Sequence, residues 1–128
     1  MTLSDAIHWD SNGLVAVIVQ EEASQRVLMF AWMNQEALRL TLHSQEAVYW
    51  SRSRSKLWRK GEESGHIQQV QALYLDCDGD CLLLMVKQSG GIACHTGRAS
   101  CFFRQQKGDN WRTIDPVLKS PQEMYRHE

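Results

Sequence analysis

Apolar and polar residues follow one another in short blocks over most of the chain, and the longest apolar blocks have the length of a strand. Strand-length blocks that are rich in β-branched or aromatic residues, or that alternate between apolar and polar positions, are typical of β-structure. The pattern predicts strands at residues 13–20, 26–33, 47–51, 67–76, 81–88 and 99–105. The polar segment EEASQ suits a short hairpin connection between the first two strands.

One segment has helical character. Asn34 is a typical N-cap residue, and good helix formers follow it, so a helix is predicted at residues 35–44. One helix among several strands predicts an α+β fold, a roll with mainly antiparallel pairing. Residues 51–66 are polar, basic and interrupted by glycine, which predicts a loop. The chain is expected to form a single domain over residues 1–128, with a peripheral tail after about residue 112 that contains both prolines.

Composition narrows the class of protein. The 128 residues include 14 basic and 15 acidic side chains, so the net charge of −1 gives no reason to expect a nucleic-acid or membrane partner. The N-terminus lacks the basic start and apolar core of a signal peptide, and no apolar run reaches the length of a membrane span. We therefore expect a cytoplasmic protein. In that reducing compartment, the four cysteines are expected to be metal ligands, catalytic groups or core residues rather than disulfides.

The segment DCDGDC, at residues 76–81, alternates carboxylates with thiols. It is not an EF-hand calcium loop, because Cys81 stands where that loop needs glycine and Lys87 stands where it needs glutamate. In an extended chain alternate residues share one face, so three carboxylates would converge: Asp76, Asp78 and Asp80. Such a group either binds a hard cation such as Mg²⁺ or forms a solvated acidic turn, and the spacing leaves both open.

The cysteines suggest a second site. Cys94 and Cys101 lie in the glycine-containing segment GGIACHTGRASCFF, and together with Cys77 or Cys81 they could hold zinc with its fourth position open. An open position is typical of catalytic zinc, whose bound water has a pKa of about 7. Cys81 begins an apolar strand and is better interpreted as a small core residue. Because carboxylates and Cys77 point to opposite faces of an extended segment, two separate metal sites are expected.

Four segments in order, MFAWMNQEAL, YWSRSRSKLWRKGEESGH, DCDGD and ACHTGRASCFFR, resemble the phosphoribosyl-AMP cyclohydrolase family of histidine biosynthesis. The resemblance runs from about residue 13 to residue 104. It implies a hydrolase in which zinc-activated water opens the N1–C6 bond of the adenine ring of N1-(5-phosphoribosyl)-AMP, the third step of the pathway. The product would be the phosphoribosylformimino-aminoimidazole carboxamide ribotide. Because the sequence stops at Glu128, the resemblance implies the single-function form, without the pyrophosphohydrolase domain that many bacterial members carry.

The same resemblance implies an interleaved homodimer with one Zn²⁺ and one Mg²⁺ per subunit. Its magnesium ligands fall on Asp76, Asp78 and Asp80. Its zinc ligands fall on Cys94 and Cys101 of one subunit and on Cys77 of the partner subunit.

The substrate of that family carries two phosphoryl groups and a cationic purine. Arginine forks and hydroxyl groups suit phosphate, so the expected substrate-binding residues are Ser51, Arg52, Ser53, Arg54, Trp58 and Lys60. The alternative for the basic residues is a solvated loop, and the alternative for Trp58 is packing in the core or at the dimer interface. His95, beside a zinc ligand, is the candidate general acid or base, unless it only orients water or a ligand. His66, after the Gly65 turn, is a further candidate for substrate contact.

Two other classes of function compete. A zinc-stabilised module could bind single-stranded nucleic acid through RSRSKLWRK, but there is no second basic stretch and the net charge is near zero. A nucleobase deaminase would carry H-x-E and P-C-x-x-C, and neither motif is present.

Overall fold

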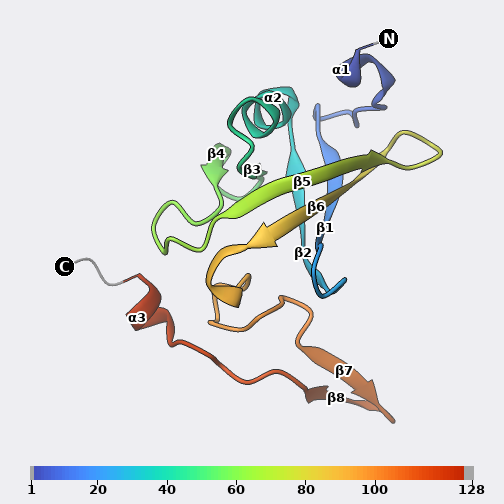
Figure 1. Cartoon of the computed structure of the whole chain (residues 1–128). Helices are drawn as coiled ribbons and strands as arrows, with labels where there is room; N and C mark the ends of the chain where they lie inside the picture. Colours follow the sequence, from blue (N-terminus) through green and yellow to red (C-terminus); the bar gives the residue numbers. More distant parts are fainter. Residues whose placement is uncertain (1, 126–128) are drawn as a thin grey trace.

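A four-stranded sheet forms the centre of the computed structural model, which describes residues 2–125 (Figure 1). Its strands β1 (Val15–Glu21), β2 (Val27–Met33), β5 (Gln68–Leu75) and β6 (Cys81–Gln88) lie in the order β2-β1-β6-β5. β1 pairs with β6 in parallel, whereas the other two pairs are antiparallel. The prediction of an α+β fold with mainly antiparallel strands is confirmed. The parallel pair at the centre of the sheet was not predicted.

The remaining elements surround this sheet. They are α1 (Leu3–Ala6), α2 (Gln35–Ser44), β3 (Val48–Ser51), β4 (Lys56–Arg59), η1 (Ser89–Gly91), β7 (Arg104–Lys107), β8 (Asn110–Thr113) and α3 (Pro121–Met124). The main helix α2 has the predicted bounds, and the Asn34 side chain accepts a hydrogen bond of 2.8 Å from the amide of Ala37, as an N-cap does. None of the described helices is long and apolar enough to cross a membrane.

One face of the sheet forms the core. Val17 and Val19 of β1 are fully buried together with Leu84 and Val86 of β6, and α2 and β3 pack against them through Ala37, Leu38 and Tyr49, among others. Alternation of side chains along a strand explains why every second residue of β1 and β6 is buried.

The opposite face of the sheet is also apolar, and nothing within residues 2–125 covers it fully. The strand register places Phe30, Ile18, Leu83 and Tyr74 in one row across all four strands. Phe30 is 48% exposed and Tyr74 is 57% exposed. A contiguous apolar surface on a sheet is typical of an interaction face.

Two sequence-based assignments are wrong. Residues 51–66 were predicted to be a loop, but β3 and β4 form a hairpin around the turn at residues 52–55. β4 has only four residues, two polar and two apolar, so its pattern is too short to show the period of a strand. The strand predicted at residues 99–105 is irregular as far as residue 103. There the Ser100 hydroxyl bonds the Val27 carbonyl at 2.8 Å, and the Cys101 amide bonds the Leu28 carbonyl at 2.7 Å, in place of a strand ladder.

A chain of buried polar side chains connects β3, β5 and β6. The Tyr49 hydroxyl donates to Gln68 Oε1 at 2.5 Å, and Gln68 Nε2 donates to Gln88 Oε1 at 2.9 Å. Gln88 Nε2 in turn donates to the His66 carbonyl at 3.0 Å. Since Tyr49 and Gln68 are fully buried, each polar atom depends on its partner in this chain.

Replacing Tyr49 by Phe should destabilise the protein by about 1–3 kcal/mol, because Gln68 would lose the donor to its buried oxygen. The free energy of unfolding in urea measures the effect. Ser11→Ala is the control, since it removes a hydroxyl from an exposed residue in the turn before β1, and it should change stability by less than about 0.5 kcal/mol. Equal effects of the two changes would contradict the importance of the buried chain.

Candidate functional site

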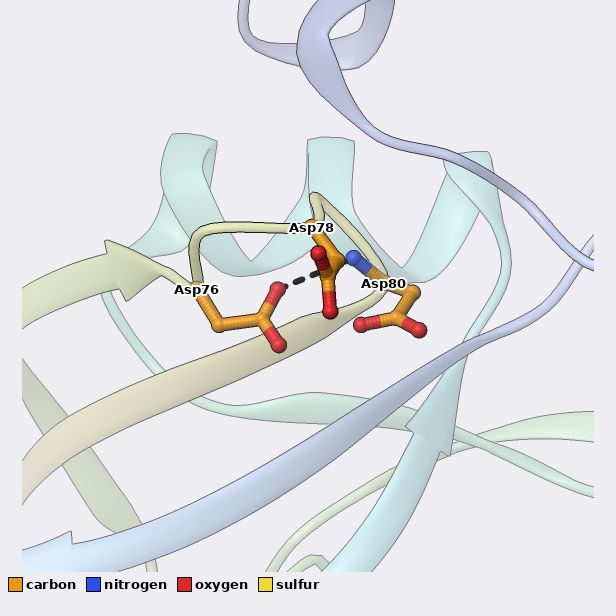
Figure 2. A group of neighbouring side chains, drawn as sticks. All are labelled: Asp76, Asp78 and Asp80. Atoms are coloured by element: carbon orange, nitrogen blue, oxygen red, sulfur yellow. Dashed lines mark hydrogen bonds between the residues drawn. The ribbon is translucent and has the colours of Figure 1, made fainter.

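Three carboxylates gather in the turn between β5 and β6, which we call the acidic turn (residues 76–80). Oxygens of Asp76, Asp78 and Asp80 all lie within 4.8 Å of one another, and all three residues are exposed (Figure 2). The predicted convergence is confirmed, but an extended chain does not produce it. The segment turns at Gly79, whose φ is +74°, and Asp76 Oδ1 accepts the Asp80 amide at 3.0 Å. These carboxylates could hold a hard cation.

The two outer aspartates of the acidic turn differ electrostatically. The hydrogen bond and the negative charge of Asp76 raise the pKa of Asp80. Loss of surrounding water raises the pKa of Asp76, but hydrogen bonds from the amides of Asp80 and Cys81 outweigh that effect and lower it. The repulsion between these carboxylates is what a bound cation would relieve.

Two thiols meet in a second segment, which we call the cysteine loop (residues 94–101). Cys94 is buried, and its sulfur accepts a hydrogen bond of 3.0 Å from the Thr96 hydroxyl. Cys101 is exposed as a whole residue, yet burial of its thiol and the adjacent Cys94 raise its pKa to about 12, while Lys60 opposes them. Lys60 therefore places a positive charge beside both thiols. The Lys60 charge offsets the rise only in part, so the Cys101 thiol keeps its proton near neutral pH until a metal ion displaces it.

Cys77 does not join these thiols within one chain. It lies in the acidic turn, before β6, whereas the cysteine loop follows β6, at the other end of the sheet (Figure 1). The eight residues of β6 span about 26 Å at about 3.3 Å per residue. Within residues 2–125, the three aspartates are the only group of three metal-ligating side chains close enough to share an ion. Cys81 starts β6 and is half-buried, but it lies on the face of Leu83 and outside the core cluster, so the prediction of a core residue is wrong.

A cavity of about 650 Å³ lies between the β3–β4 hairpin, the segment after it and the cysteine loop. Six of its lining residues were predicted from sequence: Ser51, Ser53, Arg54, Trp58, Lys60 and His95. The other lining residues were not predicted as site residues, and all of them except Gly61 carry polar groups: Arg59, Glu62, Glu63, Ser64 and Tyr125. The acidic pair directly follows the basic segment, so its position was a usable signal. No sequence signal pointed to Tyr125, because the fold brings it to the cavity from the far end of the chain.

The basic residues of the hairpin do not all face the cavity. Arg52 does not line the cavity, and its guanidinium lies 4.6 Å from the centre of the Trp32 ring. The turn at residues 52–55 separates it from Arg54, which does line the cavity. The Lys60 ammonium donates to the Ala93 carbonyl at 2.5 Å and so ties the hairpin to the cysteine loop.

Trp58 lies at the cavity, whereas His66 lies outside its lining. Trp58 packs against Tyr49, with ring centres 5.2 Å apart, and also lines the cavity, so the packing and substrate-contact interpretations are compatible. The His66 ring lies against Gly90 and outside the cavity lining. Burial, with Lys119 and Lys60 nearby, lowers the pKa of His66.

Comparison with known proteins places this arrangement in a family. A family model described as phosphoribosyl-AMP cyclohydrolase matches residues 29–103. A phosphoribosyl-AMP cyclohydrolase of Pseudomonas aeruginosa (strain UCBPP-PA14) is 61% identical over 123 residues, which are 96% of this chain and 92% of that protein. One from Methylobacillus flagellatus is 56% identical over 127 residues, which are 99% of this chain and 98% of that protein.

The chain belongs to the phosphoribosyl-AMP cyclohydrolase family. It is therefore a hydrolase of the histidine-biosynthesis pathway. The matched residues include the acidic turn, the cysteine loop and the β3–β4 hairpin. The tail that reaches the cavity through Tyr125 lies beyond them.

Asp76→Asn should lower the pKa of Asp80 toward the ordinary aspartate value, because the change removes the nearest negative charge while the amide oxygen still accepts the turn hydrogen bond. Carboxyl carbon NMR shifts, titrated without divalent cations, measure this pKa. Asp109→Asn, in the exposed β7–β8 turn, is the control and should leave Asp80 unchanged. An unaltered Asp80 titration in Asp76→Asn would show that the aspartates do not interact.

Proposed function

We propose that this chain hydrolyses the N1–C6 bond of the adenine ring of N1-(5-phosphoribosyl)-AMP, as a phosphoribosyl-AMP cyclohydrolase. The observation that carries the proposal is the cavity in which the hydroxyl and basic side chains of the β3–β4 hairpin face His95, directly beside the paired thiols. The product is the ring-opened phosphoribosylformimino-aminoimidazole carboxamide ribotide of histidine biosynthesis. Membership of the family supports this choice of substrate over other nucleotides.

The cavity suits a phosphorylated nucleotide with a positively charged base. Arg54 supplies a guanidinium fork for a phosphate, and Ser51 and Ser53 supply hydroxyl donors beside it. Trp58 offers an aromatic face at the same wall. Glu62 and Glu63 add negative charge that can balance the cationic purine. The positive charge of the purine makes its C6 atom more electrophilic.

The donor set of the cysteine loop fits zinc. Cys94 and Cys101 offer two adjacent soft sulfur ligands, and Lys60 beside them offsets the negative charge that several thiolates bring. We infer that Cys77 of the partner subunit is the third ligand. Zinc held by three protein ligands supplies an activated water near neutral pH.

His95 is the proposed proton carrier. It follows the zinc-ligand position Cys94 directly and lines the cavity, so its imidazole can reach a ring nitrogen of a bound purine. Opening of the N1–C6 bond leaves a nitrogen that must gain a proton, which histidine can deliver near neutral pH.

An interleaved homodimer would complete the site. The uncovered row of apolar residues on the sheet needs a partner surface, and the β7–β8 hairpin is exposed along its whole length, with Trp111 72% exposed. Cys77 and the three aspartates share one turn. A partner that brings Cys77 to the cysteine loop therefore also brings its aspartates to the cavity, where they would hold Mg²⁺ with open positions for water or a phosphate oxygen.

With zinc and Mg²⁺ supplied, the protein should convert phosphoribosyl-AMP, followed by the ultraviolet change of ring opening. Cys101→Ala should lose zinc and activity together, by about 100-fold or more, because a thiolate ligand is removed. Asp78→Asn should lose activity but keep about one zinc per subunit. Cys81→Ala is the control and should keep both. A zinc-loaded wild-type dimer without turnover would contradict the proposed function.

Mixing two inactive variants tests whether the zinc site is shared. In a heterodimer of Cys77→Ala and Cys94→Ala subunits, one site would combine both changes, and the other would contain three intact cysteines. Activity should therefore reappear after unfolding and joint refolding, at up to about half the wild-type value per heterodimer. Each variant refolded alone is the control. No recovered activity in a verified heterodimer would refute a site that takes Cys77 from the partner subunit.

A further inference from the structure

The tail of the chain runs across the cysteine loop. The Leu118 amide donates to the Gly97 carbonyl at 2.8 Å, and the Lys119 amide approaches the same oxygen at 3.4 Å. Gly97 has a φ of +89°, and a Cβ atom there would lie 1.8 Å from the Lys119 carbonyl oxygen. The loop and the tail therefore touch at a point where only glycine fits.

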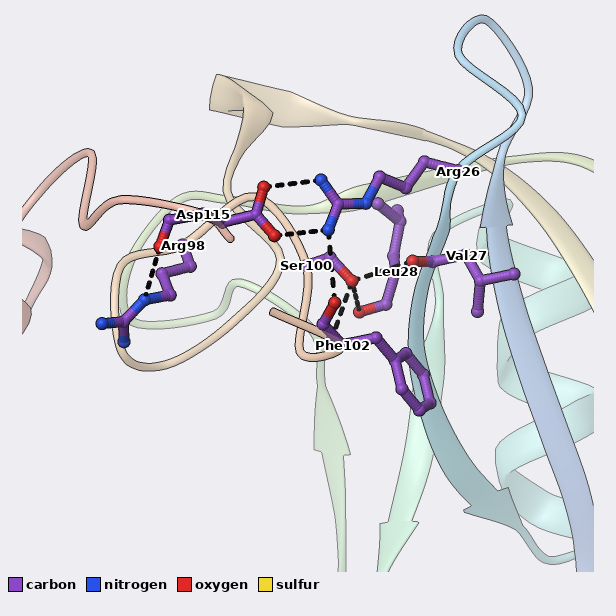
Figure 3. Close-up of polar contacts among 7 residues, drawn as sticks. All are labelled: Arg26, Val27, Leu28, Arg98, Ser100, Phe102 and Asp115. Carbon is purple, nitrogen blue, oxygen red and sulfur yellow. Dashed lines mark hydrogen bonds and ion pairs between the residues drawn. The ribbon is translucent and has the colours of Figure 1, made fainter. Parts of the chain in front are cut away.

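Asp115 connects the tail to two arginines (Figure 3). Its carboxylate accepts both terminal nitrogens of Arg26, at 2.7 and 2.5 Å, and its backbone carbonyl accepts Arg98 Nε at 3.0 Å. Arg26 directly precedes β2, and Arg98 lies inside the cysteine loop. The side chain of Asp115 is 14% exposed and that of Arg26 is 34% exposed, so this bidentate pair is partly buried.

The opposite side of the cysteine loop is attached to β2. The Ser100 hydroxyl donates to the Val27 carbonyl at 2.8 Å, and the Cys101 amide donates to the Leu28 carbonyl at 2.7 Å. Arg26 reaches the same region through the Phe102 carbonyl, at 3.3 Å. The loop is thus held between the edge of the sheet and the tail, and Arg26 contacts both.

We propose that residues 114–125 form a strap that fixes the geometry of the cysteine loop, with Asp115 as the positioning residue. The strap lies outside residues 29–103, the part that the family model matches, and it supplies neither thiol nor imidazole. It acts through the loop, because ligands that are held in place before a metal binds lose less freedom on binding. At its end the strap reaches the cavity with Tyr125. This inference rests on the proposed function only for the identity of metal and substrate.

Asp115→Ala should free the loop. Amide hydrogen exchange at Cys94 and Cys101, measured without metal or substrate, should become about 10-fold faster or more. The Cys94 amide donates to the Arg98 carbonyl and the Cys101 amide to the Leu28 carbonyl, and both hydrogen bonds depend on the position of the loop. The zinc dissociation constant, measured by chelator competition, should rise by about 10–100-fold. The kcat should fall at limiting zinc and recover at excess zinc, and Asp115→Glu should partly restore zinc affinity by restoring the ion pair.

Glu36→Ala is the matched control, because it breaks an arginine–carboxylate pair with Arg39 on the exposed face of α2. It should change neither amide exchange in the loop nor zinc affinity. If Asp115→Ala does not fold, Asp115→Asn, which keeps the side-chain volume, serves for the same measurements.

The outcomes separate the two proposals. Unchanged loop exchange and unchanged zinc affinity in a folded Asp115 variant would refute the strap, whatever the activity. The same loss in Glu36→Ala as in Asp115→Ala would also refute it. A wild-type protein whose zinc affinity depends on Asp115, but which does not convert phosphoribosyl-AMP, would support the strap and refute the proposed function.

Discussion

The position of β6 constrains everything that the molecule can assemble. β6 pairs with β1 on one side and with β5 on the other, so it can neither shorten nor bend without loss of both ladders. Its eight residues, about 26 Å long at about 3.3 Å per residue, run between the acidic turn, which also carries Cys77, and the segment that leads to the cysteine loop. The groups that the proposed chemistry requires are therefore held apart in one chain, and a second chain is the simple means of joining them.

The chain of buried hydrogen bonds from Tyr49 to Gln88 also connects β6 to the wall of the cavity. It joins β3 to β6 through Gln68 and ends on the His66 carbonyl, in the segment that leads from the hairpin into β5. Lys60 adds a direct bond from the hairpin to the loop. Because buried hydrogen bonds are costly to leave unmade, the cavity wall and the thiols keep a defined relative position.

Much of the fold was readable from local patterns. The bounds of α2 and β6 agree with the prediction, since an N-cap, a helix-forming run and a continuous apolar strand are local signals. The short strand β4 was not predicted, because four residues carry too little periodicity. The aromatic segment before β7 was misleading, because the Ser100 side chain takes up a backbone carbonyl that a ladder would use.

The sequence by itself determined which chemical groups are present and in what order, because ligand type and spacing are properties of the chain. It placed three aspartates close enough to converge, and it paired two thiols with a histidine. Only the tertiary structure decided which of these groups share a site. The β3–β4 turn sends Arg52 to Trp32 and leaves Arg54 at the cavity, and the strap brings Tyr125 to the same wall. Such placements depend on contacts between residues far apart in the chain, which no local pattern encodes.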